Sequence, residues 1–123
     1  MADPARVLVV DDQAEMAEMI ADDLAEHGYD AVAISSARQA LRQIVTERFD
    51  ALITDVDMPG VSGIALLRAS TKLDPLRPVI VMTAYSTLQT AMEATGDGAY
   101  HYLAKPFQLD LLRRLLGQAL EFR

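Results

Sequence analysis

The first apolar run of the chain reads Arg6-Val7-Leu8-Val9-Val10-Asp11-Asp12. A short β-branched run of this kind is typical of a strand buried on both faces of a sheet. From Gln13 to His27 the apolar residues recur at helical spacing, and Gly28 follows as a stop signal. The start of the chain therefore predicts a buried strand, two acids at its carboxyl end and an amphipathic helix.

The same alternation of strand and helix continues along the chain. Short strands that alternate with helices pair in parallel through right-handed crossovers, which places helices on both faces of the sheet. The sequence therefore predicts an α/β fold with a doubly wound sheet of five parallel strands. The further strands are expected at 31–34, 51–54, 78–82 and 100–103, and the further helices at 36–48, 62–72, 86–95 and 107–120.

Length and composition indicate one folded domain. The chain has 123 residues, of which 51% are hydrophobic and 24% charged, and single domains commonly have about 100–150 residues. No apolar run approaches the roughly 20 residues that span a bilayer, and the N-terminus lacks the pattern of a signal peptide. The absence of cysteine excludes disulfides and thiolate metal sites. We expect a cytoplasmic protein without a membrane partner.

The charge of the chain is unevenly distributed. Residues 1–60 hold 13 acids and 4 bases, a net charge of −9, whereas residues 61–123 hold 5 acids and 7 bases, a net charge of +2. Nucleic-acid binding needs a basic surface, so direct binding of nucleic acid by this domain is not expected. A metal cation is the more plausible ligand of the acidic half.

Three acids follow two of the predicted buried strands: Asp11 and Asp12 after the first, and Asp55 after the third. If these strands are neighbours, the carboxylates converge, and like charges at close range are costly unless a cation is present. Hard oxygen ligands with room for water favour Mg²⁺. A plainer interpretation stays open, in which the first two acids cap a helix and Asp55 is a turn residue.

Two further polar residues stand at strand ends, Thr83 after the fourth strand and Lys105 after the fifth. Taken alone, each is more often an ordinary strand-end or solvated side chain. Together with the acids they supply a nucleophilic carboxylate, a metal site, a hydroxyl donor and a cation. These are the groups that phosphoryl transfer requires.

Four stretches of the chain carry a family resemblance. Together they resemble the receiver domain of two-component response regulators over nearly the whole chain, and residues 54–60 and 82–86 are most similar to receivers of NtrC-type transcriptional activators. The resemblance implies the flavodoxin-like strand order 2-1-3-4-5 known for the chemotaxis member of the family. The four stretches are Val7-Leu8-Val9-Val10-Asp11-Asp12, Thr54-Asp55-Val56-Asp57-Met58-Pro59-Gly60 with Gly63 following, Val81-Met82-Thr83-Ala84, and Tyr102-Leu103-Ala104-Lys105-Pro106-Phe107.

The resemblance implies that Asp55 accepts a phosphoryl group from a sensor histidine kinase in a Mg²⁺-dependent reaction. The metal ligands would be Asp12, Asp55 and the backbone carbonyl of Asp57, with Asp11 acting mainly through water. The domain would catalyse its own phosphorylation and dephosphorylation without being an enzyme in the usual sense.

The resemblance also implies a conformational switch. Thr83 and Lys105 would hold phosphoryl oxygens, and Tyr102 would turn inward as Thr83 moves toward the phosphoryl group. The Lys105–Pro106 peptide bond would be cis, which is mainly a property of bonds before proline. The switching face would comprise residues 78–83, 86–95, 100–103 and 107–120.

This face could also form a homodimer. The leucines of the last predicted helix are expected mainly to pack in the core, and a role in dimerisation stays open; they are Leu109, Leu111, Leu112, Leu115, Leu116 and Leu120. Residues 1–123 would be the N-terminal receiver part of a larger regulator with a covalently linked effector domain. For an NtrC-like protein, the other parts would be an ATPase and a DNA-binding domain.

Two positions near the site differ within the family, and we hypothesise that they set the lifetime of the phosphoryl group. Asp57 adds an acid at the mouth of the site, two residues after Asp55. Tyr85 places a ring two residues after Thr83, where an attacking water molecule must approach.

Three other functions are less consistent with the sequence. Asp55-Val56-Asp57 reproduces the D-x-D motif of phosphatases with an aspartate nucleophile, but those enzymes place their second acid pair after the lysine. A receiver-like module that works without phosphorylation is disfavoured because every acceptor, metal and switch position is filled with a competent residue type. A flavin carrier would need a Ser/Thr-rich phosphate loop after the first strand, where this chain has acids.

Overall fold

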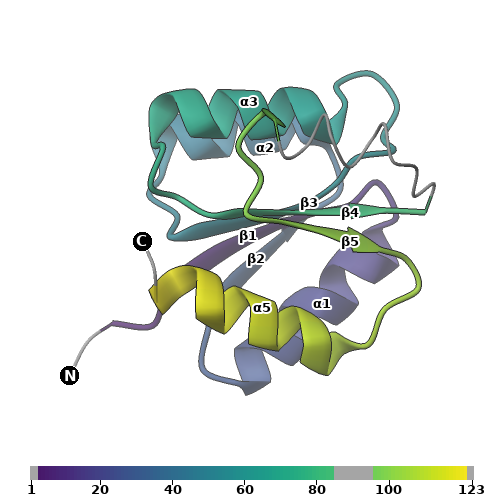
Figure 1. Cartoon of the computed structure of the whole chain (residues 1–123). Helices are drawn as coiled ribbons and strands as arrows, with labels where there is room; N and C mark the ends of the chain where they lie inside the picture. The colour runs from purple at the N-terminus through teal and green to yellow at the C-terminus, as the bar shows by residue number, and fades with distance from the viewer. Residues whose placement is uncertain (1–2, 85–95, 122–123) are drawn as a thin grey trace.

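Five strands form one parallel sheet in the order β2-β1-β3-β4-β5 (Figure 1). The computed structural model describes residues 3–84 and 96–121 of the chain. The predicted doubly wound α/β fold and its strand order are confirmed. The strands are β1 (Arg6–Val10), β2 (Asp30–Ile34), β3 (Ala51–Asp55), β4 (Val79–Thr83) and β5 (His101–Ala104).

Two helices cover each face of the sheet in the described part of the chain. The helices α1 (Ala14–Glu26) and α5 (Leu109–Glu121) lie on one face, and α2 (Ala37–Thr46) and α3 (Gly63–Leu73) lie on the other (Figure 1). Successive residues of β1 point to opposite faces, so Val7 and Val9 enter one core cluster, and Leu8 and Val10 enter the other. This is the burial on both faces that the β-branched run predicted.

The register of the sheet brings the polar strand ends to one edge. Asp11 follows the β1 residue that pairs with Thr54, so it comes beside Asp55 at the end of β3. Thr83 is the last residue of β4 and pairs with the residue that precedes Lys105. The carboxyl ends of neighbouring parallel strands therefore collect the acids, the hydroxyl and the ammonium group.

The helix boundaries differ from the predicted ones by a few residues. α5 begins at Leu109, because the carbonyl of Gln108 accepts the first helical hydrogen bonds while Phe107 packs partly against the core. α1 ends before Gly28, which has a φ of 92°. Only glycine adopts such a value readily, so the predicted stop signal is confirmed. The predicted helix 86–95 lies outside the described residues.

The leucines of α5 mainly pack in the core. Leu112 and Leu116 are buried, and Leu109, Leu115 and Leu120 pack partly against the same cluster. Leu111 lies off this stripe and is 37% exposed.

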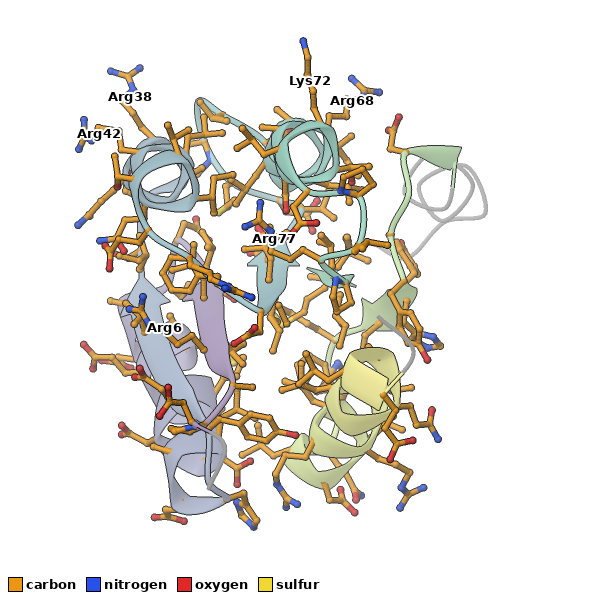
Figure 2. The ribbon with its side chains drawn as sticks, turned by 90° about the vertical axis from the view of Figure 1, so that its left-hand side faces the viewer. Arg6, Arg38, Arg42, Arg68, Lys72 and Arg77 are labelled. Carbon is orange, nitrogen blue, oxygen red and sulfur yellow. The ribbon has the colours of Figure 1, made fainter. Side chains whose placement is uncertain are left out.

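Charged side chains are unevenly distributed among α1, α2 and α3. The sequence of α1 contains five acids and no base, whereas α2 and α3 contain bases and no acid. Arg38 and Arg42 on α2, and Arg68 and Lys72 on α3, project outward from the two helices (Figure 2).

Among the described residues, no helix is long and apolar enough to cross a bilayer.

Arg77 lies between α3 and β4 in the chain. Unlike the four labelled bases of α2 and α3, it points inward beneath α3 (Figure 2). It is buried, and its Nε donates a hydrogen bond of 2.9 Å to the Ser70 hydroxyl. Burial lowers the pKa of the Arg77 guanidinium, and the nearby Asp74 charge opposes that effect. The contact ties α3 to the start of β4.

Candidate metal and phosphoacceptor site

Three carboxylates converge at the carboxyl edge of the sheet. Asp11, Asp12 and Asp55 each offer an oxygen, and the three oxygens lie within 4.8 Å of one another. Asp11 and Asp55 are buried, at 0% and 3% exposure, whereas Asp12 is exposed. Buried acids at this spacing repel one another, so they favour a bound cation. An all-oxygen donor set with one side open to water fits Mg²⁺.

Lys105 neutralises part of this negative charge. Its Nζ donates a 2.8 Å hydrogen bond to Asp11 Oδ2 and lies 3.4 Å from Asp55 Oδ2. Burial by itself would lower the pKa of the Lys105 ammonium, but the hydrogen bond to Asp11 and the charges of both acids outweigh burial and raise that pKa. The side chain is therefore a fixed cation directly beside Asp55.

Asp55 is the most strongly perturbed acid of the site. Burial raises the pKa of its carboxyl group from 3.8 to about 6, and the negative charge of Asp11 adds to the rise. The Asp57 N–H, which donates a 3.1 Å hydrogen bond to Asp55 Oδ1, and the charge of Lys105 oppose it. The ionised form of Asp55 is thus held at an energetic cost, and a cation would relieve that cost.

The Asp57 side chain is hydrogen-bonded to the end of β4. Its Oδ2 accepts a 2.8 Å hydrogen bond from Thr83 Oγ1 and a 3.2 Å hydrogen bond from the Ala84 N–H. The sequence predicts this carboxylate at the mouth of the site but does not predict its contact with Thr83. The residues are 26 positions apart, so no local spacing signals the contact.

The helix-cap interpretation of the first two acids is only partly right. The N-cap of α1 is Gln13, whose side chain makes no capping hydrogen bond. Asp11 Oδ1 does accept a 2.9 Å hydrogen bond from the Gln13 N–H. Asp11 therefore shapes the turn that leads into α1 with one oxygen and binds Lys105 with the other.

Residues 7–117 match the profile of the response regulator receiver domain. The chain belongs to this family. ZraR, a transcriptional regulatory protein of Escherichia coli (strain K12), is 41% identical over 114 residues, which is 93% of this chain and 26% of ZraR. The DNA-binding transcriptional regulator NtrC of Rhizobium meliloti (strain 1021) is 40% identical over 116 residues, or 94% of this chain and 24% of NtrC. The predicted similarity to NtrC-type regulators is confirmed, and this chain spans about a quarter of these relatives.

Solved receiver domains have the same fold. A CheY-like receiver domain protein from Methanospirillum hungatei superimposes with a TM-score of 0.92 at 27% identity, covering 96% of this chain and 94% of that one. The beryllofluoride-activated NtrC4 receiver dimer has a TM-score of 0.88 at 32% identity and coverages of 94% and 96%. TrrA from Thermotoga maritima, solved in complex with Mg²⁺ and beryllofluoride, has a TM-score of 0.84 at 29% identity and coverages of 94% and 98%.

Family membership indicates the general role of the acidic cluster in this receiver domain. Receiver domains bind Mg²⁺ at an acidic pocket, act with histidine kinases and are signalling phosphoacceptors. The Asp11, Asp12 and Asp55 carboxylates form the acidic pocket here. The Lys105–Pro106 peptide bond is cis, in agreement with the resemblance. Tyr85 lies outside the described residues.

A cavity of about 360 Å³ adjoins the acidic pocket of the receiver domain. Its lining includes Asp12, Ser36, Arg38 and Met58, which come from three different loops or helix starts. No sequence pattern indicates this cavity, since only the folded chain brings these segments together. It leaves open space next to the exposed acid of the pocket.

Tyr102 packs on the α2–α3 side of the sheet in this receiver domain. Its hydroxyl is buried and has no hydrogen-bond partner among the residues that the structure describes. A buried hydroxyl without a partner loses its hydration without compensation. Among the described residues, the side chain therefore contributes apolar contacts and no hydrogen bond from its hydroxyl.

Replacing Tyr102 by Phe is expected to raise the free energy of unfolding by about 1 kcal/mol, because the substitution removes the uncompensated hydroxyl. Urea denaturation measures the change. Tyr100→Phe is the control, because Tyr100 is exposed and its hydroxyl can be hydrated. A loss of stability in Tyr102→Phe would mean that the hydroxyl has a partner after all.

Proposed function

We propose that this domain receives a phosphoryl group on Asp55 from a sensor histidine kinase and thereby switches an effector. The observation that carries the proposal is the placement of Asp55: a buried carboxylate with two further acids within 4.8 Å and the Lys105 ammonium 3.4 Å away. These are a nucleophile, a cation site and a fixed positive charge in one place. Family membership supports the same function.

In the proposed reaction, an Asp55 carboxylate oxygen attacks the phosphorus of the phosphohistidine. The new O–P bond forms as the P–N bond breaks. The electron pair of the broken P–N bond stays on the imidazole nitrogen, which then takes a proton. Lys105 stabilises the negative charge on the phosphoryl oxygens as it is transferred. Dephosphorylation is the attack of water on the acyl phosphate, which returns Asp55 and inorganic phosphate.

Mg²⁺ would be held by Asp12, Asp55 and the Asp57 backbone carbonyl, with Asp11 acting mainly through water. When bound, it supplies positive charge that offsets the repulsion between the acids and the incoming phosphoryl group. The Asp57 N–H, hydrogen-bonded to Asp55 Oδ1, orients the nucleophile independently of the metal.

The conformational output is proposed to run through Thr83 and Tyr102. New phosphoryl oxygens would draw the Thr83 hydroxyl, Tyr102 would follow, and the face formed by β4, β5, α5 and residues 86–95 would change its partners. This face is our candidate for a homodimer interface, in line with the NtrC4 receiver, which was solved as a dimer.

The domain is proposed to be the N-terminal receiver of a cytoplasmic transcription regulator. The relatives ZraR and NtrC are about four times as long as the part matched here and are transcription regulators. By analogy, a linked ATPase and a DNA-binding domain would carry the output, so that the receiver itself contacts no nucleic acid.

Asp57 and Tyr85 are proposed to set the lifetime of the phosphoryl group, with the Tyr85 ring obstructing attacking water. Tyr85→Ala is expected to speed dephosphorylation several-fold, which phosphate release measures. An unchanged rate would remove Tyr85 from the proposal.

Intact-mass measurement after incubation with acetyl phosphate tests the function directly. We expect a single phosphoryl increment that requires Mg²⁺ and is lost in Asp55→Asn. No increment, no consumption of acetyl phosphate and demonstrable Mg²⁺ binding would favour a receiver-like module that works without phosphorylation. Sustained consumption of the donor without an adduct would indicate rapid turnover, as in a phosphatase.

A further inference from the structure

The Asp57 carboxylate accepts hydrogen bonds from two donors at the end of β4. Its Oδ2 accepts from both Thr83 Oγ1 (2.8 Å) and the Ala84 N–H (3.2 Å). Thr83 is fully buried, whereas Asp57 is exposed. One anionic oxygen therefore binds a side-chain donor and the next backbone donor of the same strand end.

The backbone of Asp57 is hydrogen-bonded to Asp55 at the end of β3. Its N–H donates to Asp55 Oδ1 at 3.1 Å, and the Val56 N–H donates to the Met82 carbonyl at 2.8 Å. Asp55 pairs with Met82 in the sheet, so the ends of β3 and β4 are neighbours. Asp57 thus spans from the phosphoacceptor to the strand end that carries Thr83.

A carboxylate and a phosphoryl group are both anionic hydrogen-bond acceptors, and charge-assisted hydrogen bonds of the two kinds are similar in strength. In the function proposed above, on which this inference rests, Thr83 must donate to a phosphoryl oxygen on Asp55. In the structure its hydroxyl donates to Asp57. The same donor cannot serve both acceptors with its single proton.

We infer that Asp57 is a positioning residue whose side chain competes with the phosphoryl group for Thr83 and the Ala84 N–H. In the unphosphorylated domain its carboxylate holds the end of β4 in the resting arrangement. Phosphorylation must displace this carboxylate, and repulsion between two anions assists the displacement. Breaking the Asp57–Thr83 hydrogen bond costs free energy. The strength of this contact then sets how much of the free energy supplied by phosphorylation is used in the conformational switch.

Beryllofluoride affinity at saturating Mg²⁺ tests the competition in the whole domain. Asp57→Ala is expected to bind beryllofluoride about tenfold more tightly than the wild type, because the competing acceptor is gone. The loss of a nearby negative charge would also tighten binding of an anion, whatever Thr83 does. A double-mutant cycle with Thr83→Ala separates the two causes.

If the competition operates, Asp57→Ala tightens binding much less in the Thr83→Ala background than in the wild type. Equal tightening in both backgrounds would mean that charge alone acts and would overturn the inference. Asp57→Asn adds a second comparison, because a neutral amide oxygen still accepts the two hydrogen bonds. It should lie between the wild type and Asp57→Ala, whereas a pure charge effect makes the two variants equal.

A measurement without any phosphoryl mimic keeps this inference distinct from the proposed function. Amide hydrogen exchange at Ala84 in the unmodified domain should be several-fold faster in Asp57→Ala than in the wild type, and no faster in Asp55→Asn than in the wild type. Unchanged exchange in Asp57→Ala would refute the contact itself. Failure of every variant to bind beryllofluoride, with the exchange result as expected, would instead count against the phosphoacceptor function and leave the hydrogen bonds of Asp57 standing.

Discussion

Replacing Asp55 by Asn is expected to raise the free energy of unfolding of the metal-free domain by up to about 3 kcal/mol at pH 7.5. Burial raises the pKa of Asp55 to about 6, and the charge of Asp11 adds to it. Holding the ionised form in the fold therefore costs free energy that an amide does not. The Asn side chain still accepts the hydrogen bond of the Asp57 N–H, and Lys105 keeps its contact with Asp11.

The stability difference depends on pH in a definite direction. In the unfolded chain Asp55 ionises near its ordinary pKa of 3.8, but in the fold it ionises only near 6. Between these values the folded state binds more protons, so wild-type stability falls as pH rises through this window. The advantage of Asp55→Asn should therefore shrink by about half when the pH is lowered from 7.5 to 5.

Urea denaturation at several pH values and Mg²⁺ concentrations measures both effects. Mg²⁺ is expected to stabilise the wild type by binding only the folded acids, and to stabilise Asp55→Asn much less. Asp110→Asn is the control, since Asp110 is an exposed acid in the first turn of α5, and its stability should change by less than about 0.5 kcal/mol. If the Asp55→Asn variant is no more stable than the wild type at pH 7.5, ionised Asp55 does not destabilise the fold, which would contradict the prediction.

Gly63→Ala is expected to lower the free energy of unfolding by about 3 kcal/mol or more. A Cβ at Gly63 would overlap the carbonyl oxygen of Asp55 and lie 2.7 Å from its carbonyl carbon and 2.8 Å from Val56 Cα. All three are backbone atoms, so no side chain can move aside. Relief requires α3 to shift away from the end of β3, and that shift would also displace Asp55.

The same variant should lose Mg²⁺-dependent phosphorylation at temperatures where it remains folded, because the acceptor is moved away from its partners. Gly117→Ala is the matched control: its Cβ would have only an ordinary contact, 3.9 Å from the Tyr29 hydroxyl. That glycine lies inside α5, so alanine should stabilise the domain by about 0.5–1 kcal/mol. Equal stability of the two variants in urea would contradict the close packing of α3 on β3.

Local sequence patterns predicted most of the architecture. The β-branched runs, the helical spacing of apolar residues and Gly28 act through neighbours in the chain, so they were readable without a structure. The start of α5 was less predictable, because it depends on which carbonyl accepts the first helical hydrogen bonds. The strand order came from family resemblance, since alternation alone does not state which strands are neighbours.

The candidate site divides in the same way. The chain by itself determined that acids, a hydroxyl and a lysine stand at strand ends, because the carboxyl ends of parallel strands share one edge of the sheet. Only the tertiary structure decided that Asp57 contacts Thr83, that Gly63 lies against the Asp55 backbone, and that burial raises the pKa of Asp55. These properties depend on distances and solvent exclusion between segments far apart in sequence, and residue type and spacing do not encode such quantities locally.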